Sequence, residues 1–213
     1  MKKKKRVYPR HVRALRRLAV ALGLLLFCNC ALHVGLLLPI QALRVCEQSE
    51  GVYERTQVVW RRWEPNMMHL VDALYLTESE NTLSLFCTHP SVLGWLDGFV
   101  WPIDTSNGGE VHLGLVDMSR DKHERTVVFY GRIDASDVTR LELHGESVDR
   151  NTGFALGVSQ DNWFVRDGKT YLLLAEPCRF GKWEQAEYSL IVETEDGETA
   201  EYPVEQVASV FWG

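Results

Sequence analysis

Cys87 and His89 stand two residues apart in the segment FCTHP, and a cysteine beside a histidine can supply the thiolate and the base of a nucleophilic enzyme. That chemistry also needs a third group to orient the histidine, and the flanking residues offer none. The sequence contains no G-x-S-x-G turn of the kind that holds a catalytic serine. We therefore interpret Cys87 as a strand cysteine, nominate no catalytic residue and expect the protein not to be an enzyme.

Two further segments carry ligands that could hold a cation. The segment DMSRDKHE contains three carboxylates and a histidine, namely Asp117, Asp121, His123 and Glu124. Basic residues are interleaved with them and oppose a metal, which favours a solvated turn between two strands. The segment DTSNGGE, residues 104–110, combines oxygen ligands with glycines but lacks the spacing of an EF-hand loop. We expect no metal ion and no cofactor at either place.

Three aromatic residues, Trp95, Phe99 and Trp101, crowd into the segment GWLDGFVWP. Aromatic faces on a loop can form a platform for a sugar ring or a partner protein, so these three are the candidate ligand- or partner-binding residues. The alternative is that they plug the open end of a β-sandwich, because tryptophan is mostly buried on average. Trp60 and Trp63, which flank two arginines, are instead expected at or near a membrane surface.

The chain contains five cysteines, and no two of them form a C-x-x-C motif. Cys28 and Cys30 lie inside a long apolar run, where buried thiols behave as small apolar side chains. Outside that run, Cys87 and Cys178 form a possible disulfide in an oxidising environment. This pairing would leave Cys46 for a partner chain.

The apolar run extends from Leu18 to Leu38, twenty-one residues without a formal charge, and ends before Pro39. As a helix rising about 1.5 Å per residue it would be about 31 Å long, close to the ~30 Å hydrocarbon thickness of a bilayer. A cleaved signal peptide would have a shorter apolar region, followed by small residues at the cleavage site. We therefore predict an uncleaved signal-anchor, a single transmembrane helix over residues 18–40.

Charge is distributed unevenly along the chain. The first seventeen residues carry nine Lys or Arg and no acid; because the whole chain has a formal net charge of −6, the remainder carries −15. Basic residues beside an apolar run stay on the cytoplasmic side, which places the C-terminal part outside the cell membrane. A nucleic-acid-binding domain would carry its basic residues on a folded face, so we expect no nucleic-acid partner.

The acidic remainder has the pattern of β-structure. The segment ALYLTESENTLSLFC alternates apolar and polar residues around a turn, which predicts a hairpin over residues 73–87. Residues 91–110 are expected to form a long ordered loop. Seven apolar segments follow between turn signals: 111–118, 125–133, 138–145, 153–159, 169–175, 186–194 and 199–205. This spacing predicts a mainly β fold, an antiparallel β-sandwich of the Ig-like or a similar type.

The segment VVFYGRIDASDVTRLELHG joins an apolar strand ending in Tyr130-Gly131-Arg132 to a short acidic turn and an alternating strand. Together with ALYLTESENTLSLF, it resembles the outer domains of uncharacterised, membrane-anchored proteins of Gram-positive bacteria. The resemblance implies a small β-sandwich outside the membrane. It implies no activity and no site residues.

These patterns divide the chain into a basic cytoplasmic tail (1–17), a transmembrane helix (18–40), a juxtamembrane connector (41–65) and an extracytoplasmic β-sandwich (66–213). We expect a single-pass, membrane-anchored envelope protein whose outer domain is non-catalytic and binds a membrane or cell-wall partner. Two alternatives stay open: a cell-wall polymer hydrolase or carbohydrate-binding protein, and a regulatory subunit that acts through a membrane partner. The lipid bilayer is itself an expected partner, because the basic tail attracts anionic head groups.

Overall fold

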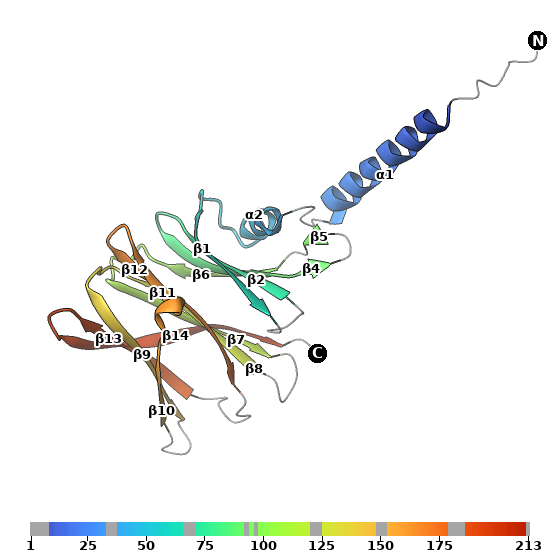
Figure 1. The fold of residues 1–213 in the computed structure, drawn as a ribbon. Coiled ribbons are helices and arrows are strands. Elements are labelled where there is room, and N and C mark those ends of the chain that lie inside the picture. Colours follow the sequence, from blue (N-terminus) through green and yellow to red (C-terminus); the bar gives the residue numbers. More distant parts are fainter. Residues whose placement is uncertain are drawn as a thin grey trace, which may run out of the picture.

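The computed structural model describes residues 9–32, 38–65, 71–91, 94–95, 98–119, 125–147, 153–178 and 186–211. Figure 1 shows a β-rich body from which one helix projects, α1 (Arg10–Leu32). A second helix, α2 (Pro39–Ser49), lies on the body. The strands form a four-stranded sheet, an eight-stranded sheet and a two-stranded ribbon, which confirms the predicted mainly β, sandwich-type fold.

The four-stranded sheet is antiparallel and has the order β1-β2-β3-β6. Its strands are β1 (Gln57–Pro65), β2 (Val71–Glu78), β3 (Thr82–Thr88) and β6 (Phe99–Asp104). The predicted hairpin is confirmed as β2 and β3. The predicted long loop is wrong, because its segment contributes β6 and part of the ribbon formed by β4 (Pro90–Ser91) and β5 (Gly94–Trp95). Pro102 is compatible with β6 because β6 is an edge strand.

The eight-stranded sheet has the order β10-β9-β13-β14-β7-β8-β12-β11. Its strands are β7 (Val111–Ser119), β8 (Arg125–Ile133), β9 (Val138–Ser147), β10 (Gly153–Gly157), β11 (Trp163–Arg166), β12 (Lys169–Cys178), β13 (Ala186–Thr194) and β14 (Thr199–Phe211), with a 3-10 turn (Gln160–Asn162) before β11. All seven predicted segments contain strands, whereas β11 is absent from the prediction. Asp167 and Gly168 both have positive φ, as a tight β11–β12 hairpin of type I′ requires.

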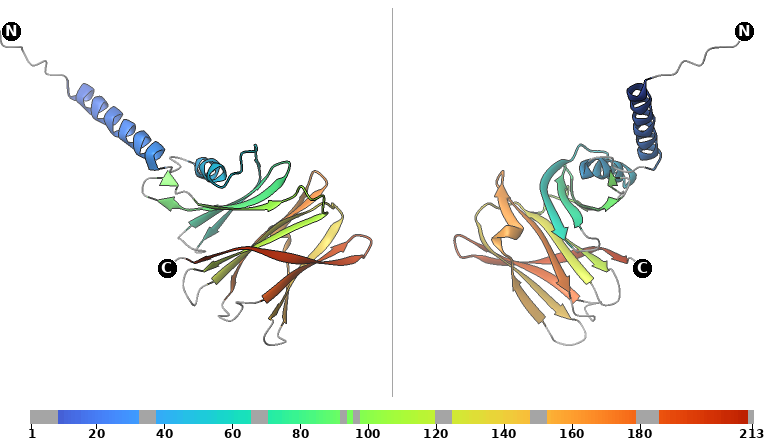
Figure 2. Two further views of the ribbon diagram at one scale, coloured as in Figure 1. Left: turned by 180° about the vertical axis from the view of Figure 1, so that it is seen from behind. Right: turned by 45° about the vertical axis from the view of Figure 1, so that its right-hand side comes forward.

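β14 holds two parts of the large sheet together. Through Val204 it pairs antiparallel with β13, and from Glu205 it pairs parallel with β7. The two parts face each other across a shared apolar cluster, with β7, β8 and β12 forming a middle layer and β9 and β13 an outer layer. Figure 2 shows the four-stranded sheet stacked on the other side of the middle layer, with α2 covering its far face.

Burial on both faces explains the long apolar runs in several strands. The middle layer is covered by the four-stranded sheet on one face and by the outer layer on the other, so residues 127–130 and 172–174 are buried without interruption. β9 alternates instead, with Leu141 and Leu143 buried between exposed or half-buried polar residues. Its outer face therefore meets solvent.

The predicted single helix over residues 18–40 is wrong. α1 already begins at Arg10, and the proline in the first turn of α2, Pro39, begins a separate helix. Within the described part of the chain, no helix is both long and apolar enough to cross a membrane.

Residues 41–65, which the sequence predicts to be a connector, contain most of α2 and the edge strand β1. Ala42 and Leu43 of α2 are fully buried against the four-stranded sheet. α2 places one apolar face on the sheet because its buried residues recur at helical spacing. The packed part of the protein therefore begins at Pro39.

A buried carboxylate fixes α2 in place. Glu47, which is 2% exposed, accepts hydrogen bonds on Oε1 from the hydroxyls of Thr56 at 2.6 Å and Thr77 at 3.3 Å. Arg44 pairs with Oε2 of Glu47 at 2.6 Å and also donates to the carbonyl oxygen of Thr56 at 2.9 Å. These contacts link α2 to β2 and to the segment before β1. Because a buried carboxylate is costly without its donors, these bonds favour the observed position of α2.

Candidate functional site

The structure does not bring the three predicted platform residues onto one surface. Phe99 and Trp101 stand two apart on β6 and therefore share the face that points to the middle layer, with their ring centroids 5.8 Å apart. Trp101 is only 6% exposed, whereas Phe99 is 38% exposed. Trp95 lies on β5 and packs on the opposite face of the sheet, beside α2. Ligand binding by Phe99 or Trp95 stays a prediction.

Trp95 contacts a different tryptophan. Its ring centroid lies 5.4 Å from that of Trp63 on β1, which is 43% exposed. The guanidinium of Arg61 lies 5.9 Å from the centroid of the Trp63 ring, within the range of a cation–π contact. We call Arg61, Trp63 and Trp95 the aromatic patch. It combines two indole rings and a cation on the α2 side of the four-stranded sheet.

A bulge in β1 decides which tryptophan reaches this patch. The pairing register with β2 shifts between Val58 and Trp60, which leaves one extra residue in β1. Trp60 then points towards the middle layer, where its ring centroid lies 4.9 Å from that of Phe164 on β11. Trp63, three residues further on, points to the α2 side. The expectation of a membrane-surface position therefore does not hold for Trp60.

Two cysteines of the body, Cys46 and Cys87, are buried. Cys87 is a free cysteine, and burial raises the pKa of its thiol well above the ordinary value, with a further contribution from the charge of Asp72. Cys178 ends β12, and its side chain lies outside the described residues. The possible Cys87–Cys178 bridge therefore involves a side chain outside the described residues. Cys46, expected to face a partner chain, donates its thiol proton inside the body to the carbonyl oxygen of Gly98 at 2.9 Å.

Neither predicted cation segment gathers ligands in the described residues. Asp117 is buried on β7, and residues 120–124 lie outside the described part of the chain. In the second segment, Asp104 Oδ1 accepts a hydrogen bond from the backbone N–H of Ser106 at 2.8 Å. Its oxygen therefore closes a turn, as aspartate often does. Among the residues with described side chains, no three His, Cys, Asp or Glu lie close enough together to hold a metal ion.

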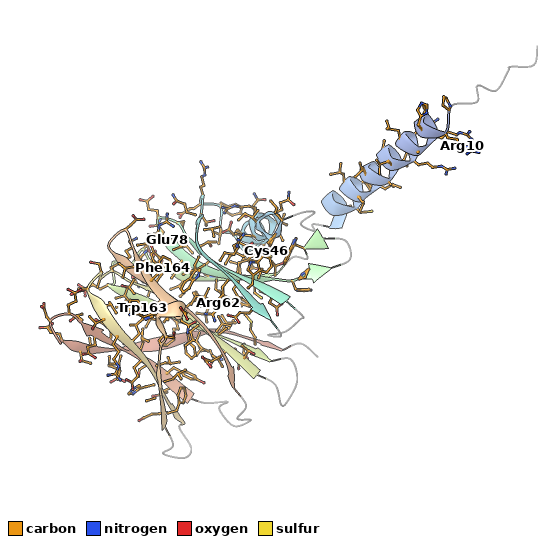
Figure 3. All side chains as sticks on the ribbon, viewed as in Figure 1. Arg10, Cys46, Arg62, Glu78, Trp163 and Phe164 are labelled. Carbon is orange, nitrogen blue, oxygen red and sulfur yellow. The ribbon has the colours of Figure 1, made fainter. Side chains whose placement is uncertain are left out.

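A charged cluster ties the four-stranded sheet to the middle layer. Glu78, labelled in Figure 3 at the end of β2, receives Arg132 Nη1 at 2.6 Å and Lys169 Nζ at 2.9 Å on Oε1. The hydroxyl of Tyr171 donates to Oε2 of Glu78 at 2.7 Å. Arg132 also pairs with Asp134 through its Nε, at 2.7 Å. We call these five residues the inter-sheet charge cluster.

Glu78 and Tyr171 of the inter-sheet charge cluster each keep one protonation state near neutral pH. Burial alone would raise the pKa of the Glu78 carboxyl, but the hydrogen bonds from Lys169, Tyr171 and Arg132 outweigh it and lower that pKa below its ordinary value. Burial and the hydrogen bond to Glu78 raise the pKa of Tyr171. Near neutral pH, Glu78 is therefore ionised and Tyr171 is neutral, so neither group is suited to proton transfer. We interpret the cluster as a structural tie.

We expect acid to destabilise the protein partly through Glu78. Because its folded-state pKa is lowered from 4.5, its stabilising contribution is complete above about pH 4.5 and is lost as the pH falls through the folded-state pKa. Thermal unfolding of the wild-type protein and of Glu78→Gln between pH 7 and pH 3 measures this contribution. The difference in melting temperature should shrink as the pH falls, and a constant difference would contradict the assignment.

An open groove of about 640 Å³ lies on the exposed side of the outer layer. Its walls include His144, Ser189 and Glu201. Ser189 donates its hydroxyl proton to Glu201 Oε1 at 2.5 Å, and His144 Nε2 lies 3.0 Å from a carboxylate oxygen of Glu142. A serine nucleophile needs a histidine base within hydrogen-bond reach, and the hydroxyl of Ser189 is bonded to Glu201 instead.

The fold and these sites define a mainly β, sandwich-type protein with a projecting helix that is basic at one end and apolar along most of its length. Comparison with protein-family models, curated proteins and solved structures found no match. The expected resemblance to anchored envelope proteins of Gram-positive bacteria stays a prediction.

Proposed function

We propose that the N-terminal segment anchors this protein in the cell membrane and that the β body is a non-catalytic binding domain on the outer side. One observation carries the proposal, the apolar surface of α1. Eight large apolar side chains between Leu15 and Phe27 are each 42–73% exposed. They surround the helix, a distribution typical of helices covered by lipid or by other protein. Burying each side chain would contribute about 1.5–3 kcal/mol.

The charges of α1 favour lipid as the cover. Arg10, Arg13, Arg16 and Arg17 lie at its N-terminal end, and its first turn contains no acidic residue. The helix dipole disfavours cations at that end, so these arginines do not stabilise the helix itself. They suit anionic lipid head groups, where each basic residue contributes about 1 kcal/mol. Basic flanks remain in the cytoplasm, which supports an outer location for the body.

The described polar groups support a binding rather than a catalytic role for the body. The carboxylate of Glu78 is neutralised by its neighbours, and the thiol of Cys87 is buried with a raised pKa. The aromatic patch, by contrast, presents unreactive rings at the surface. Such surfaces bind through contact area and contribute no chemistry of their own. A membrane or cell-wall partner is the expected ligand of the body.

The anchor is tested with Leu22→Arg, which places a charge in the middle of the apolar surface of α1. An arginine at the centre of an inserted helix costs about 2.5–3.5 kcal/mol, so we expect the partition coefficient into vesicles to fall about a hundredfold. Flotation of the full-length protein with anionic vesicles measures it. Val165→Arg is the matched control, because Val165 is similarly exposed, at 44%, but lies on the body.

Unchanged flotation of Leu22→Arg would contradict a membrane anchor. The orientation is tested separately, by attaching a tag to the C-terminus and adding protease to intact cells. We expect the tag to be digested, because the body is placed outside. Protection of the tag would reverse the proposed orientation.

A further inference from the structure

We propose that the aromatic patch of Arg61, Trp63 and Trp95 lies in the head-group zone of the bilayer that holds α1, and that it fixes the orientation of the body on the membrane. This inference rests on the proposed function, because it requires a membrane-held α1. It adds a second contact with lipid, made by the folded body.

The position of the patch is the first argument. Figures 1 and 2 show the β4–β5 ribbon beside the C-terminal end of α1 in every view. Trp95 belongs to that ribbon, and Trp63 lies in ring contact with it. The basic residues of α1 are at its other end. With the basic end of α1 at the inner head groups, as proposed above, its C-terminal end points towards the outer membrane surface, and the patch lies on that side of the body.

The chemistry of the patch is the second argument. Tryptophan is enriched where hydrocarbon meets water, because its ring is apolar while its indole N–H donates hydrogen bonds. Trp63 is 43% exposed although it lies in a strand of a well-packed sheet. Arg61 is exposed beside it, with its guanidinium near the Trp63 ring. A guanidinium bonds phosphate oxygens bidentately, so the same surface meets acyl chains with its rings and head groups with its charge.

The rigidity of the support is the third argument. Trp63 of β1 is paired with Ala73 of β2. Ala73 is fully buried and belongs to the apolar cluster against which Trp95 packs. The rings of Tyr75 and Phe86 lie in this cluster, with their centroids 6.0 Å apart. Because the patch stands on the sheet and beside the tethered α2, a contact with lipid would orient the whole body rather than a single loop.

Tryptophan quenching in vesicles tests this inference on the full-length protein. The vesicles contain phosphatidylcholine, phosphatidylglycerol and a lipid brominated close to the head-group end of its acyl chains, which quenches tryptophans at that depth. We expect the wild-type emission to be quenched, and the double variant Trp63→Phe/Trp95→Phe to lose roughly half or more of that quenching. Trp60→Phe is the matched control, because Trp60 lies between the sheets and its removal should leave the quenching unchanged.

The outcomes separate this inference from the proposed function. A protein that does not float with vesicles would overturn both. A protein that floats, but whose quenching is the same in the double variant, would overturn the patch inference alone. The inference is also wrong if a soluble wall polymer, and not the vesicles, shields Trp63 from aqueous quenchers. Trp63→Phe alone keeps the test valid if the double variant does not fold, because Trp63 is partly exposed and phenylalanine retains its apolar contacts.

Discussion

Replacing Arg132 with methionine is expected to lower the free energy of unfolding by about 3–5 kcal/mol. The Arg132 side chain is 7% exposed and connects Glu78 of the four-stranded sheet with Asp134 beside the middle layer. Its removal leaves the Glu78 carboxylate, 16% exposed, without its closest cation. Lys169 remains paired with Glu78, but both Glu78 and Asp134 lose the arginine between them and cannot regain full hydration, and this is the source of the large cost. Urea unfolding at pH 7 measures the effect.

Two comparison variants make the Arg132 result specific. Arg140→Met removes an arginine that also pairs with a glutamate at 2.6 Å, but its side chain is 64% exposed, so the cost should be below about 1 kcal/mol. The double variant Arg132→Met/Glu78→Met should recover part of the lost stability, because it removes both charges from the interior. If Arg132→Met costs no more than Arg140→Met, the inter-sheet charge cluster does not hold the two layers together.

Gly98→Ala is expected to lower the free energy of unfolding by about 3 kcal/mol or more, at or above the upper end of the usual range for overpacked sites. A Cβ atom at Gly98 would lie 1.6 Å from the carbonyl oxygen of Cys87 and 2.6 Å from its carbonyl carbon. Cys87 cannot retreat, because it is paired in β3 between β2 and β6. Any shift of Gly98 would also disturb the hydrogen bond from Cys46 of α2. Thermal unfolding of the purified variant measures the loss.

Gly157→Ala is the matched control for Gly98→Ala. Gly157 lies in the edge strand β10, and a Cβ there would meet no atom within 4 Å. We expect this change to be neutral or to stabilise by less than about 1 kcal/mol, because alanine restricts the unfolded chain. Equal melting temperatures for the two variants would show that β3 and the Gly98 backbone do not pack as closely as described.

The positions of most strands could be predicted from the sequence because alternation and turn residues act locally. β9 alternates along its length, and Asp196–Gly197 marks the turn between β13 and β14. The layer arrangement could not be predicted. An apolar run indicates that a strand is buried on both faces, but it does not indicate which elements cover those faces. α2 was missed because it begins directly after the apolar run, and its first two residues were assigned to the predicted transmembrane helix. Two signals for α2 were available: a proline at its first position, Pro39, and the helical spacing of the buried residues of α2.

The aromatic patch could not be predicted, for two physical reasons. Trp63 reaches it only because β1 has a bulge, and a bulge changes the face of every residue after it without a recognisable sequence signal here. Trp95 and Trp101 are close in the sequence, yet the sheet separates them, since Trp101 lies on β6 and faces the middle layer. The alternation of β6 does indicate that Phe99 and Trp101 share a face. The glycines around these aromatics suggested a loop and obscured that strand.

The pairing of β14 has a consequence for how the chain matures. β14 completes the large sheet by joining β13, its neighbour in sequence, to β7, which is made much earlier. Closing such distant pairings is slow, and here it must wait until β14 has been synthesised. Until then, the edges of β7 and β13 that pair with β14 lack their partner strand.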